Sequence, residues 1–582
     1  MALKTLYDHD VKTDDVNTSI TRKDFEGDFS IVVFPYVKVA KKKPEAVANE
    51  IGEFLRDNLK VVKDFNVVKG FVNLIVVDDY WKEFVDEHYE SNTYGQLAPK
   101  DEKVMVEFSS PNTNKPLHLG HIRNNLLGWS VCKILQRAGY EVVKANLVND
   151  RGIHICKSML AWQKFGDGET PESTGIKGDH IVGKYYVEFD KHFKAEFKEY
   201  DEKTDEFLDK NKYFNEQSKL GKEVKEMLLK WEEADPEIRA LWKKMNTWVL
   251  DGHNETYDKL GIEFDKFYFE SFTYSLGKDI IEQGVEKKVF YKLIDNSVWI
   301  DLEDMNLDKK LVLRSDGTSV YMTQDIGTAR LKHEDFGIDK SVYVVADEQN
   351  YHFQVLFEIL KRLEEPYADG LHHLSYGMVN LPSGRMKSRE GTVVDADDLI
   401  EEVIAEAKKG AEEKGGIEGI PAEEKDEIVR RIGLGALKYF LLKVNPKKSM
   451  IFNPEESVDF QGQTGPFIQY AYVRANSIFR KFESELTDAS YDNIKEQERD
   501  LIIAVNEFPS IVDSAARNYD PSEVANYCYD LAKKFHKFIH DLSILRAESE
   551  GAKVFRIKLS MFVSNVLEQG MDLLGIQMPE RM

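Results

Sequence analysis

Two histidines lie one helical turn apart where the sequence changes from a strand pattern to a helix pattern. His118 and His121 flank Leu119 and Gly120 in the stretch VEFSSPNTNKPLHLGHIRNNLLGW, residues 106–129. The first N–H groups and the dipole of a helix favour an anion, and two imidazoles there can donate hydrogen bonds to phosphate oxygens. Gly120 has no side chain, so a flat group such as an adenine or a ribose can approach the backbone. The stretch predicts a phosphate or nucleotide site, with surface or helix-capping histidines as the alternative.

Zinc is a weaker interpretation of the same histidines. The H-x-x-H spacing places two ligands one turn apart, but no nearby Cys, His or Glu supplies a usual third ligand. The cysteines Cys132, Cys156 and Cys528 are far apart and lack a C-x-x-C spacing. Neither a disulfide framework nor a cysteine-based zinc site is therefore expected, and a reducing compartment fits best. The sequence assigns no metal ligands.

A second basic stretch, LPSGRMKSREGTVV at residues 381–394, follows the last strand pattern of the predicted sheet. Its small and basic residues are Gly384, Arg385, Lys387, Ser388, Arg389 and Gly391. Mobile basic loops of this kind can close over phosphates, whereas the alternative is a solvated charged turn. A third stretch, GDHIVGKY, matches G-x-x-x-x-G-K, but Tyr185 stands where Ser or Thr must hold Mg²⁺. We interpret that match as coincidence.

The elements around the histidine pair form a predicted βαβ unit. Residues 103–110 alternate as a strand, 122–139 have apolar residues at helical spacing, and 140–148 read as a second strand. Gly139 stands where the C-terminal glycine of a helix belongs. Because a βαβ unit requires a crossover between parallel strands, the sequence predicts a parallel sheet.

The remaining chain separates into further predicted parts. Residues 1–100 read as a small α+β unit, with strand patterns at 29–40 and 70–81 and a helix pattern at 43–58. Residues 165–245 are charged and helical in pattern, as in an insertion between two halves of a sheet. The subsequent strand patterns are at 310–322 and 340–347, and the chain from 425 onward is almost entirely helical in pattern.

Length and charge limit the function classes. The 582 residues, 42% of them hydrophobic, suffice for several cores, and roughly three or four domains are expected. A net charge of −24 taken alone argues against a nucleic-acid binder, but residues 38–43, 445–448 and 533–537 are local basic clusters. The N-terminal segment has no apolar core of a signal peptide, and no apolar run of about 18 residues occurs, so a membrane span is not expected.

The two stretches resemble the signatures of class I aminoacyl-tRNA synthetases. His118-Leu119-Gly120-His121 looks like their "HIGH" signature, and residues 384–391 resemble "KMSKS". Longer strings, among them RSDGTSVYMTQDIG, ADEQNYHFQ, GALKYFLLK, GQTGPFIQYAYVRANSIFRK and the terminal LGIQMPERM, resemble the arginyl-tRNA synthetase family. The resemblance runs over nearly the whole chain and is more specific than the two short signatures.

The resemblance implies a multidomain α/β architecture. It places a tRNA-elbow-binding add-on domain at 1–100 and a Rossmann-like parallel-sheet catalytic domain at 101–424, with the helical insertion at about 165–245. It places an all-α anticodon-binding bundle at 425–582. It also implies a cytoplasmic, monomeric enzyme that binds ATP with Mg²⁺, L-arginine and tRNA(Arg). Arginyl-adenylate forms first, generally only with tRNA bound, and its arginyl group then passes to the terminal adenosine of the tRNA.

The resemblance also assigns residues to each substrate. A guanidinium suits carboxylates bidentately. The arginine-binding residues implied are Glu107, Asn112, Tyr321, Asp325 and Gln349. The ATP-binding residues implied are His118, Gly120, His121, Gly377, Met378, Val379, Met386, Lys387 and Ser388. The implied tRNA-binding residues are Tyr470, Tyr472 and Arg474, for which core packing is the alternative.

One position departs from the family pattern. Ser388 stands where the second signature usually has its catalytic lysine. Several family members share this loss, and a lysine just before the first histidine is thought to substitute; Lys115 is in that place here. Lys387 and Arg389 are the alternative cations.

Two other functions stay open at this point. One is a class I synthetase for another amino acid, for example cysteine, glutamine or glutamate. A cysteine enzyme would need zinc ligands, which are absent from the sequence, and a carboxylate substrate would need a cationic pocket instead of Asp325 and Glu107. A non-catalytic tRNA-binding paralogue is favoured by Ser388 alone, while the intact histidines, Asn112, Asp325 and Gln349 argue against it.

Overall fold

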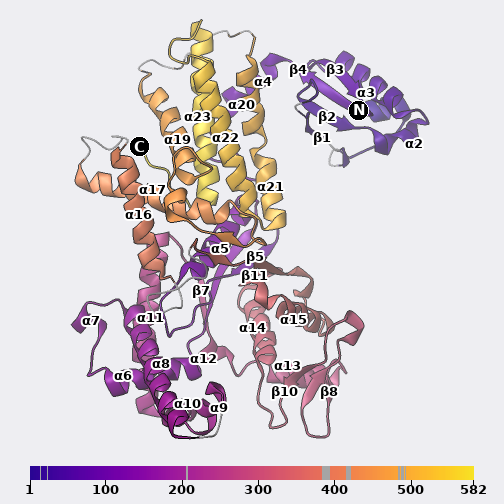
Figure 1. Cartoon of the computed structure of the whole chain (residues 1–582). Coiled ribbons are helices and arrows are strands. Elements are labelled where there is room, and N and C mark those ends of the chain that lie inside the picture. Colours follow the sequence, from indigo (N-terminus) through magenta and orange to yellow (C-terminus); the bar gives the residue numbers. More distant parts are fainter. Residues whose placement is uncertain are drawn as a thin grey trace. The chain divides into compact units, whose positions relative to one another are not determined.

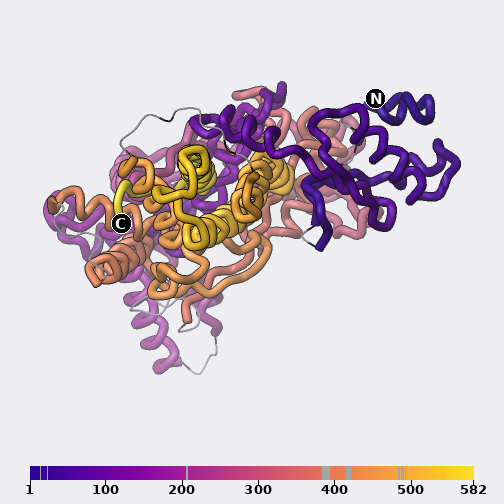
Figure 2. Tube along the Cα trace, turned by 90° about the horizontal axis from the view of Figure 1, so that it is seen from above, coloured from indigo at the N-terminus to yellow at the C-terminus, as the bar shows by residue number. Residues whose placement is uncertain are grey.

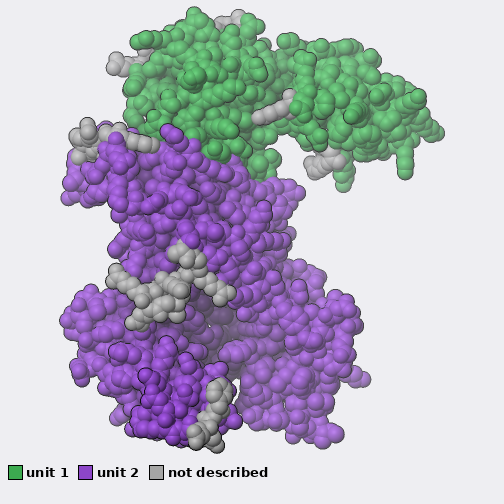
Figure 3. Space-filling view, viewed as in Figure 1, with its two compact units in different colours: residues 1–95, 467–511, 527–570 green, residues 96–466, 512–526, 571–582 purple. Residues whose placement is uncertain are grey.

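The structure of the chain is a computed structural model that divides into two compact units (Figure 3). The residues it describes are 1–12, 15–16, 18–22, 24–204, 208–382, 394–413, 421–482, 486, 491 and 493–582. Unit 1 consists of residues 1–95, 467–511 and 527–570, and unit 2 of residues 96–466, 512–526 and 571–582.

The centre of unit 2 is a five-stranded sheet in the order β12-β11-β5-β6-β7, and all its neighbouring strands are parallel. Its strands are β5 (Lys103–Glu107), β6 (Glu141–Val148), β7 (Lys266–Phe269), β11 (Lys340–Ala346) and β12 (Leu371–Tyr376). From β5 the chain adds β6 and β7 on one side, and it later adds β11 on the other side. The topological switch point therefore lies between β5 and β11, where open parallel sheets bind ligands at the carboxyl ends of their strands. The predicted Rossmann-like sheet is confirmed.

Helix α5 (Leu119–Arg137) connects β5 to β6 and is buried along most of its length. A residue with a Cβ at position 128 would approach the Phe108 ring to 2.2 Å, so Gly128 allows the helix to pack closely on the chain after β5. At the other end of the helix Gly139 adopts a φ of +91°, and a Cβ there would also meet the carbonyl oxygen of Ala98. The predicted βαβ unit is confirmed.

A helical insertion separates β6 from β7, as the sequence predicts. Its helices are α6 (Ile153–Phe165), α7 (Pro171–Thr174), α8 (Gly178–Lys203), α9 (Lys210–Glu216), α10 (Lys219–Glu232) and α11 (Pro236–Leu260). Figure 1 shows α8, α10 and α11 gathered together, and they share a core that contains Ile181, Val224, Met227 and Val249. The helices begin before residue 165 and end after residue 245, because Ile155 and Met159 of α6 and Trp248 and Val249 of α11 also pack into this core.

A second subdomain lies between β7 and β12. It contains α12 (Glu270–Thr273), α13 (Lys278–Glu286), α14 (Tyr321–Phe336), α15 (Asn350–Arg362) and the antiparallel strands β8 (Tyr291–Lys292), β9 (Val298–Ile300) and β10 (Lys310–Leu313). The strand predicted at 310–322 is therefore wrong beyond Leu313. The chain turns at Gly317, whose φ is +75°, and the Asp316 carboxylate accepts from the N–H of Thr318 at 2.9 Å. Helix α14 then begins at Tyr321.

The remaining elements of unit 2 follow the sheet. Strand β13 (Val379–Asn380) pairs in parallel with β14 (Met450–Ile451), and helices α16 (Ala396–Glu413) and α17 (Ala422–Leu442) pack against each other. They are followed by the short helix α18 (Pro454–Ser457). The predicted helical block from residue 425 thus contains one short strand.

Unit 1 combines a small α+β part with a set of long helices. The sheet order is β1-β2-β4-β3, formed by Thr18–Ile20, Phe29–Val32, Phe71–Val76 and Val62–Val68, and α3 (Pro44–Asn58) packs on it. The strand predicted at 29–40 ends at Val32, because Pro35 cannot donate to a ladder and begins the turn into α2 (Val37–Ala40). The strand predicted at 70–81 ends at Val76, and α4 (Asp78–His88) begins two residues later.

Most of the C-terminal helices also belong to unit 1. They are α20 (Glu496–Asn506) and most of α19 (Gly465–Arg480), α22 (Pro521–Asp541) and α23 (Glu550–Leu573), whereas α21 (Phe508–Asn518) begins in unit 1 and lies mostly in unit 2. Figure 2 views α22 and α23 almost along their axes. Helix α4 packs on this set: the ring of Phe84 lies 5.6 Å from that of Phe562, and Asp86 pairs with Lys558 at 2.8 Å.

No helix among the described residues combines the length and apolar character that a membrane crossing needs.

Candidate active site

His118 and His121 lie at the N-terminus of α5, directly after the loop that follows β5. His118 is the N-cap residue, and its Nδ1 accepts from the N–H of Gly120 at 3.1 Å. The Nδ1 of His121 accepts from the N–H of His118 at 3.2 Å. A ring nitrogen that accepts from a backbone N–H carries no proton, so each neutral imidazole has its proton on Nε2. Both rings thus keep one N–H donor that the capping contacts do not use.

Burial keeps the two imidazoles uncharged. It lowers the pKa of His118 to about 4, with a further lowering by the charge of Lys115, and it lowers the pKa of His121 well below its ordinary value. Burial also lowers the pKa of Lys115. Among the described residues no carboxylate lies within ion-pair distance of the Lys115 ammonium. An anionic ligand at this site would therefore meet one ammonium and two neutral N–H donors.

The end of the second signature loop lies beside the first signature. The N–H of Leu119 donates to Val394 O at 3.1 Å, and the N–H of Ala396 donates to Leu117 O at 3.0 Å. His118 and Asp395 thereby form an antiparallel bridge. The predicted ATP-binding residues Met386, Lys387 and Ser388, together with Arg389, lie outside the described residues.

Arg123 fixes the backbone that the resemblance assigns to adenine. It is fully buried in α5 and donates to Gly377 O at 2.5 Å and to Lys448 O at 2.8 Å. The N–H of Gly377 donates to Pro446 O at 3.0 Å, Met378 is 44% exposed, and Val379 is buried in β13. The Gly377–Val379 segment is thus held to the same helix that carries His121.

A cavity of about 740 Å³ opens at the carboxyl ends of the central strands. Asn112, in the loop after β5, forms a parallel bridge with Asn149 after β6. Tyr321, the first residue of α14, is 77% exposed. Asn112, Asn149 and Tyr321 line the cavity. Its other lining residues include Arg151, His154, Glu270, Tyr274, Ser319 and Gln324. The structure therefore brings two of the predicted arginine-binding residues, Asn112 and Tyr321, to one cavity.

Glu270 is the acidic group that sequence reasoning missed. Burial and the nearby charges of Asp325 and Asp150 raise the pKa of Glu270 to about 7. A carboxyl group among other carboxylates ionises readily only when a cation is bound beside it. The available signal was its place directly after β7, at the carboxyl end of a strand of the parallel sheet.

Asp325 and Glu107 have partners within the chain. Asp325 lies one turn after Tyr321 in α14, and its Oδ2 is 2.7 Å from Nε2 of His352. Glu107 is buried and forms an ion pair with Lys332, which is also buried. Burial opposes the charge of Lys332, but the Glu107 carboxylate more than offsets this and raises the pKa of the ammonium. Glu107 thus already has a cation, whereas the partner of Asp325 is a histidine.

The remaining predicted residues lie apart from this cavity lining. Gln349 is exposed at the end of the 3₁₀ turn Asp347–Gln349, before α15. Tyr470 and Arg474 lie one turn apart on the exposed side of α19, where the Tyr470 ring stacks 5.8 Å from His536. The hydroxyl of Tyr472 instead donates to Glu568 at 3.3 Å, so it faces a different side of the helix.

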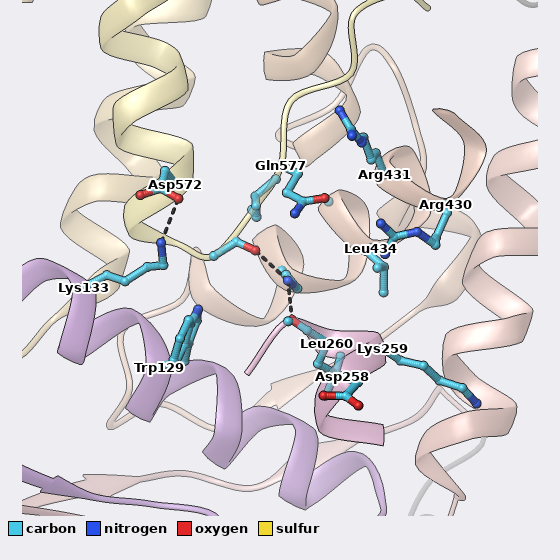
Figure 4. Close-up of a pocket in the computed structure, with 15 residues that line it drawn as sticks. Trp129, Lys133, Asp258, Lys259, Leu260, Arg430, Arg431, Leu434, Asp572 and Gln577 are labelled. Atoms are coloured by element: carbon cyan, nitrogen blue, oxygen red, sulfur yellow. Dashed lines mark hydrogen bonds and ion pairs between the residues drawn. The ribbon is translucent and has the colours of Figure 1, made fainter. Parts of the chain in front are cut away.

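A second cavity, of about 190 Å³, lies between α5, α11, α17 and the C-terminal segment (Figure 4). Lys133 and Asp572 point toward each other there and form an ion pair of 2.7 Å. The buried Lys438 donates to Leu260 O at 2.7 Å and to Gly575 O at 2.5 Å. These contacts connect α5, α11 and α17 to the C-terminal segment, which indicates a packing role for this cavity.

Three family models match the chain. They are "tRNA synthetases class I (R), catalytic domain" at residues 87–454, "DALR anticodon binding domain" at 468–582 and "Arginyl tRNA synthetase N terminal domain" at 1–76. The arginine–tRNA ligase of Bacteroides fragilis is 54% identical over 588 residues, which cover 100% of this chain and 98% of the relative. That of Flavobacterium psychrophilum is 50% identical and covers 98% and 97%.

Solved structures share the fold. The arginyl-tRNA synthetase of Thermus thermophilus has a TM-score of 0.77 and 24% identity, over 97% of this chain and 96% of that one. The enzyme from Plasmodium falciparum has a TM-score of 0.77 and 19% identity, over 100% and 97%. These likenesses confirm the predicted architecture of parallel-sheet catalytic domain, N-terminal add-on and C-terminal helices. The relatives that match over the full length are arginine–tRNA ligases, so the comparisons support neither a synthetase for another amino acid nor a non-catalytic paralogue. The chain belongs to the arginyl-tRNA synthetase family of class I aminoacyl-tRNA synthetases.

Proposed function

We propose that the chain is an arginine–tRNA ligase that activates L-arginine with ATP and transfers the arginyl group to the 3′-terminal adenosine of tRNA(Arg). One observation carries the site assignment. Glu270 is half-buried in the cavity lining, and desolvation together with the charges of Asp325 and Asp150 raises its pKa to about 7. A guanidinium relieves this repulsion, since its planar fork of donors suits carboxylates bidentately.

The proposed arginine pocket has two ends. Glu270, Asp325 and Tyr321 bind the guanidinium, and Asn112 and Gln349 bind the ammonium and carboxylate. Glu107 shares its charge with Lys332, and we assign it a weaker electrostatic contribution to the same cation. A desolvated guanidinium without such carboxylates would cost several kcal/mol.

The proposed ATP site is the N-terminus of α5. The α-phosphate and the leaving pyrophosphate accept from Nε2–H of His118 and His121, while Gly120 leaves room for the nucleoside. Adenine lies against Gly377–Val379, and Met386, Lys387 and Ser388 of the second loop close over the phosphates. Uncharged imidazoles suit this role, because preorganised donors stabilise developing charge without titrating at pH 7.

The chemistry follows from these positions. A carboxylate oxygen of arginine attacks the α-phosphorus, a P–O bond to arginine forms, and the bond to pyrophosphate breaks. Charge grows on the departing pyrophosphate, where Lys115 is the proposed catalytic cation. Phosphate oxygens are ligands that Mg²⁺ prefers, so Mg²⁺ would be held by the nucleotide and would offset part of its charge. No acidic cluster of the described part of the chain is assigned to it.

The proposal extends to the other parts of the chain. Residues 1–100 bind the tRNA elbow, residues 101–424 catalyse, with the insertion at about 165–245, and residues 425–582 bind the anticodon. Tyr470 and Arg474 share an exposed surface suited to stacking and phosphate contacts, and Tyr472 is the weakest candidate of the three. The enzyme acts as a cytoplasmic monomer.

ATP–pyrophosphate exchange with each of the twenty amino acids, with and without tRNA, tests the proposal. We expect exchange only with arginine, and only when tRNA is present. Glu270→Gln is the variant that tests the pocket, with Glu232→Gln as a control at another residue of the cavity lining. Exchange driven by cysteine or glutamate would refute the assignment.

A further inference from the structure

A buried group of charges joins the insertion helices to the segment that ends the second signature loop. The Lys177 ammonium, directly before α8, donates to Asp397 Oδ2 and to Thr256 Oγ1, each at 2.6 Å. The Lys259 ammonium of α11 donates to Asp397 Oδ1 at 2.8 Å. The side chains of Asp179 and Asp397 are 0% and 8% exposed. This group has no part in the arginine or ATP contacts described above.

His180 extends the group to the first signature. Its Nε2 lies 3.0 Å from Asp395 Oδ2, and this contact raises its pKa. Asp395 lies between the two residues that pair with the histidine segment, because Val394 O accepts from the N–H of Leu119 and the N–H of Ala396 donates to Leu117 O. The position of Asp395 therefore affects the backbone on both sides of His118.

Helices α8 and α11 also contact the loop segment of Lys115 and Pro116, which precedes the histidine pair. His253 of α11 is buried, and its Nε2 lies 3.2 Å from Lys115 O. In α8 a Cβ at Gly183 would lie 2.8 Å from Cδ of Pro116, so only glycine allows this approach without a shift. Helices α8 and α11 thus contact both residues 115–116 and residues 395–397.

The carboxylates could suggest a metal site, but the contacts argue otherwise. Asp179, His180 and Asp397 have ligand atoms close enough to share an ion. The Lys177 ammonium lies 3.3 Å from Asp179 and 2.6 Å from Asp397, so the chain already supplies the cation. Removing one charge from such a group would leave a buried partner uncompensated, which is costly. The charges therefore hold the backbone segments that carry them in fixed positions.

We propose that Lys177 and His180 are positioning residues for adenylate formation, which hold residues 394–397 against 117–119 and thereby orient His118 and His121. The proposal rests on the proposed function for the reaction it affects. Its physical basis is the sensitivity of catalysis to geometry: a shift of about 1 Å in a catalytic group costs on the order of a hundredfold in rate. Among the described residues, none that we assign to the arginine pocket is hydrogen-bonded or ion-paired to this group, so arginine binding is spared.

The test uses the full-length chain with tRNA and compares variants of one helix region. Lys177→Met is expected to lower kcat of arginine-dependent pyrophosphate exchange roughly tenfold, with KM for arginine within about twofold of wild type. Lys177→Arg, which retains the charge, restores most of the loss. Lys184→Met is the matched control, since Lys184 lies on α8 in an ion pair with Glu169 in which both side chains are exposed, and wild-type kinetics are expected.

A second measurement does not depend on activity. Hydrogen–deuterium exchange at the amides of Leu119 and Ala396 should be faster in Lys177→Met than in Lys184→Met. If Lys177→Met does not fold, His180→Leu replaces it, because His180 is 31% exposed in its side chain and its loss leaves Lys177 paired.

The outcomes separate the two proposals. Wild-type kcat and unchanged exchange at Leu119 and Ala396 in a folded Lys177→Met or His180→Leu variant would overturn the positioning role alone. So would equal losses in kcat and arginine affinity that Lys177→Arg does not restore, since these indicate general destabilisation. Absence of arginine-dependent exchange in both wild type and Lys184→Met would overturn the proposed function, and the positioning role in that reaction with it.

Discussion

His118 and His121 lie with their ring centroids 3.8 Å apart, and the second ring accepts a hydrogen bond from the backbone of the first. Two protonated imidazoles at this separation would repel each other strongly. Desolvation and the charge of Lys115 keep both neutral, and the capping contacts fix their protons on Nε2. The site therefore offers two N–H donors whose state does not change near neutral pH.

This neutrality predicts how stability depends on pH. The pKa of His118 is lowered to about 4 in the folded chain, against about 6.5 when unfolded. Between these values the unfolded chain binds more protons than the folded chain, so stability is lost as the pH falls through this window. The melting temperature of His118→Gln should therefore fall less than that of wild type between pH 7 and pH 5. His540→Gln, at an 87% exposed side chain, is the control. An identical pH dependence in His118→Gln and wild type would contradict this.

The rate of activation should depend on His121 more than ATP binding does. If its Nε2–H meets charge that develops only in the transition state, His121→Ala removes about 3 kcal/mol, or on the order of a hundredfold in kcat. KM for ATP should change little. Pyrophosphate exchange at varied ATP measures both constants, and a raised KM with unchanged kcat would show that the histidine binds the ground state only.

Arginine recognition should depend on pH through Glu270. Its pKa of about 7 means that the carboxyl is largely protonated below neutrality, so arginine must displace a proton to bind. KM for arginine should fall as the pH rises from 6 to 8, and Glu270→Gln should raise KM and remove this dependence. Asp325→Asn should cost roughly 2–5 kcal/mol in arginine kcat/KM with ATP constants little changed. The measurement is arginine KM from pH 6 to 8 for all three proteins; a KM in wild type that does not vary would remove Glu270 from the pocket.

The histidine pair and its helix were predictable because all their signals are local. The strand, the glycine between the histidines and the apolar spacing of α5 lie within one short stretch. Glu270 was not predictable in the same way, since the helical insertion separates its strand β7 from β6 and only sheet assembly brings them together. The ion-pair partner of Glu107 was not predictable for the same reason, because Lys332 lies on α14 and reaches β5 only in the folded core. The strand predicted at 310–322 was also too long, because β10 ends at Leu313 and the chain then turns at Gly317.

Lys115 should be the cation of the activation step. Lys115 is half-buried and its charge acts on both histidines, desolvation lowers its pKa, and no carboxylate among the described residues pairs with it. Lys115→Ala should reduce pyrophosphate exchange at least tenfold, about 1.4 kcal/mol or more, and Lys387→Ala should reduce it less. Transfer from preformed arginyl-adenylate should be nearly normal in Lys115→Ala, because pyrophosphate has already left. The reverse order of the two variants would assign the cation to the second loop.

Truncation should separate tRNA binding from the stability of unit 1. The N-terminal family model ends at residue 76, and the segment after it packs into the C-terminal helices. Tyr94 lies 4.9 Å and Phe84 5.6 Å from the Phe562 ring, measured between centroids, and Asp86 pairs with Lys558. Losing a packed aromatic side chain costs about 3–5 kcal/mol, so removal of residues 1–100 should lower the melting temperature much more than removal of residues 1–76.

The shorter truncation then isolates the tRNA contact. The chain carries a net charge of −24, so tRNA must meet a local basic surface, and the cluster at residues 38–43 lies in the part removed. A protein that loses phosphate contacts loses both affinity and salt dependence. Removal of residues 1–76 should weaken tRNA binding at low salt and flatten its decline with salt concentration, while tRNA-saturated pyrophosphate exchange keeps its kcat. Filter binding at several salt concentrations measures the slope. Equal affinity and slope in the truncated and complete chains would show that tRNA is held by the catalytic and C-terminal parts alone.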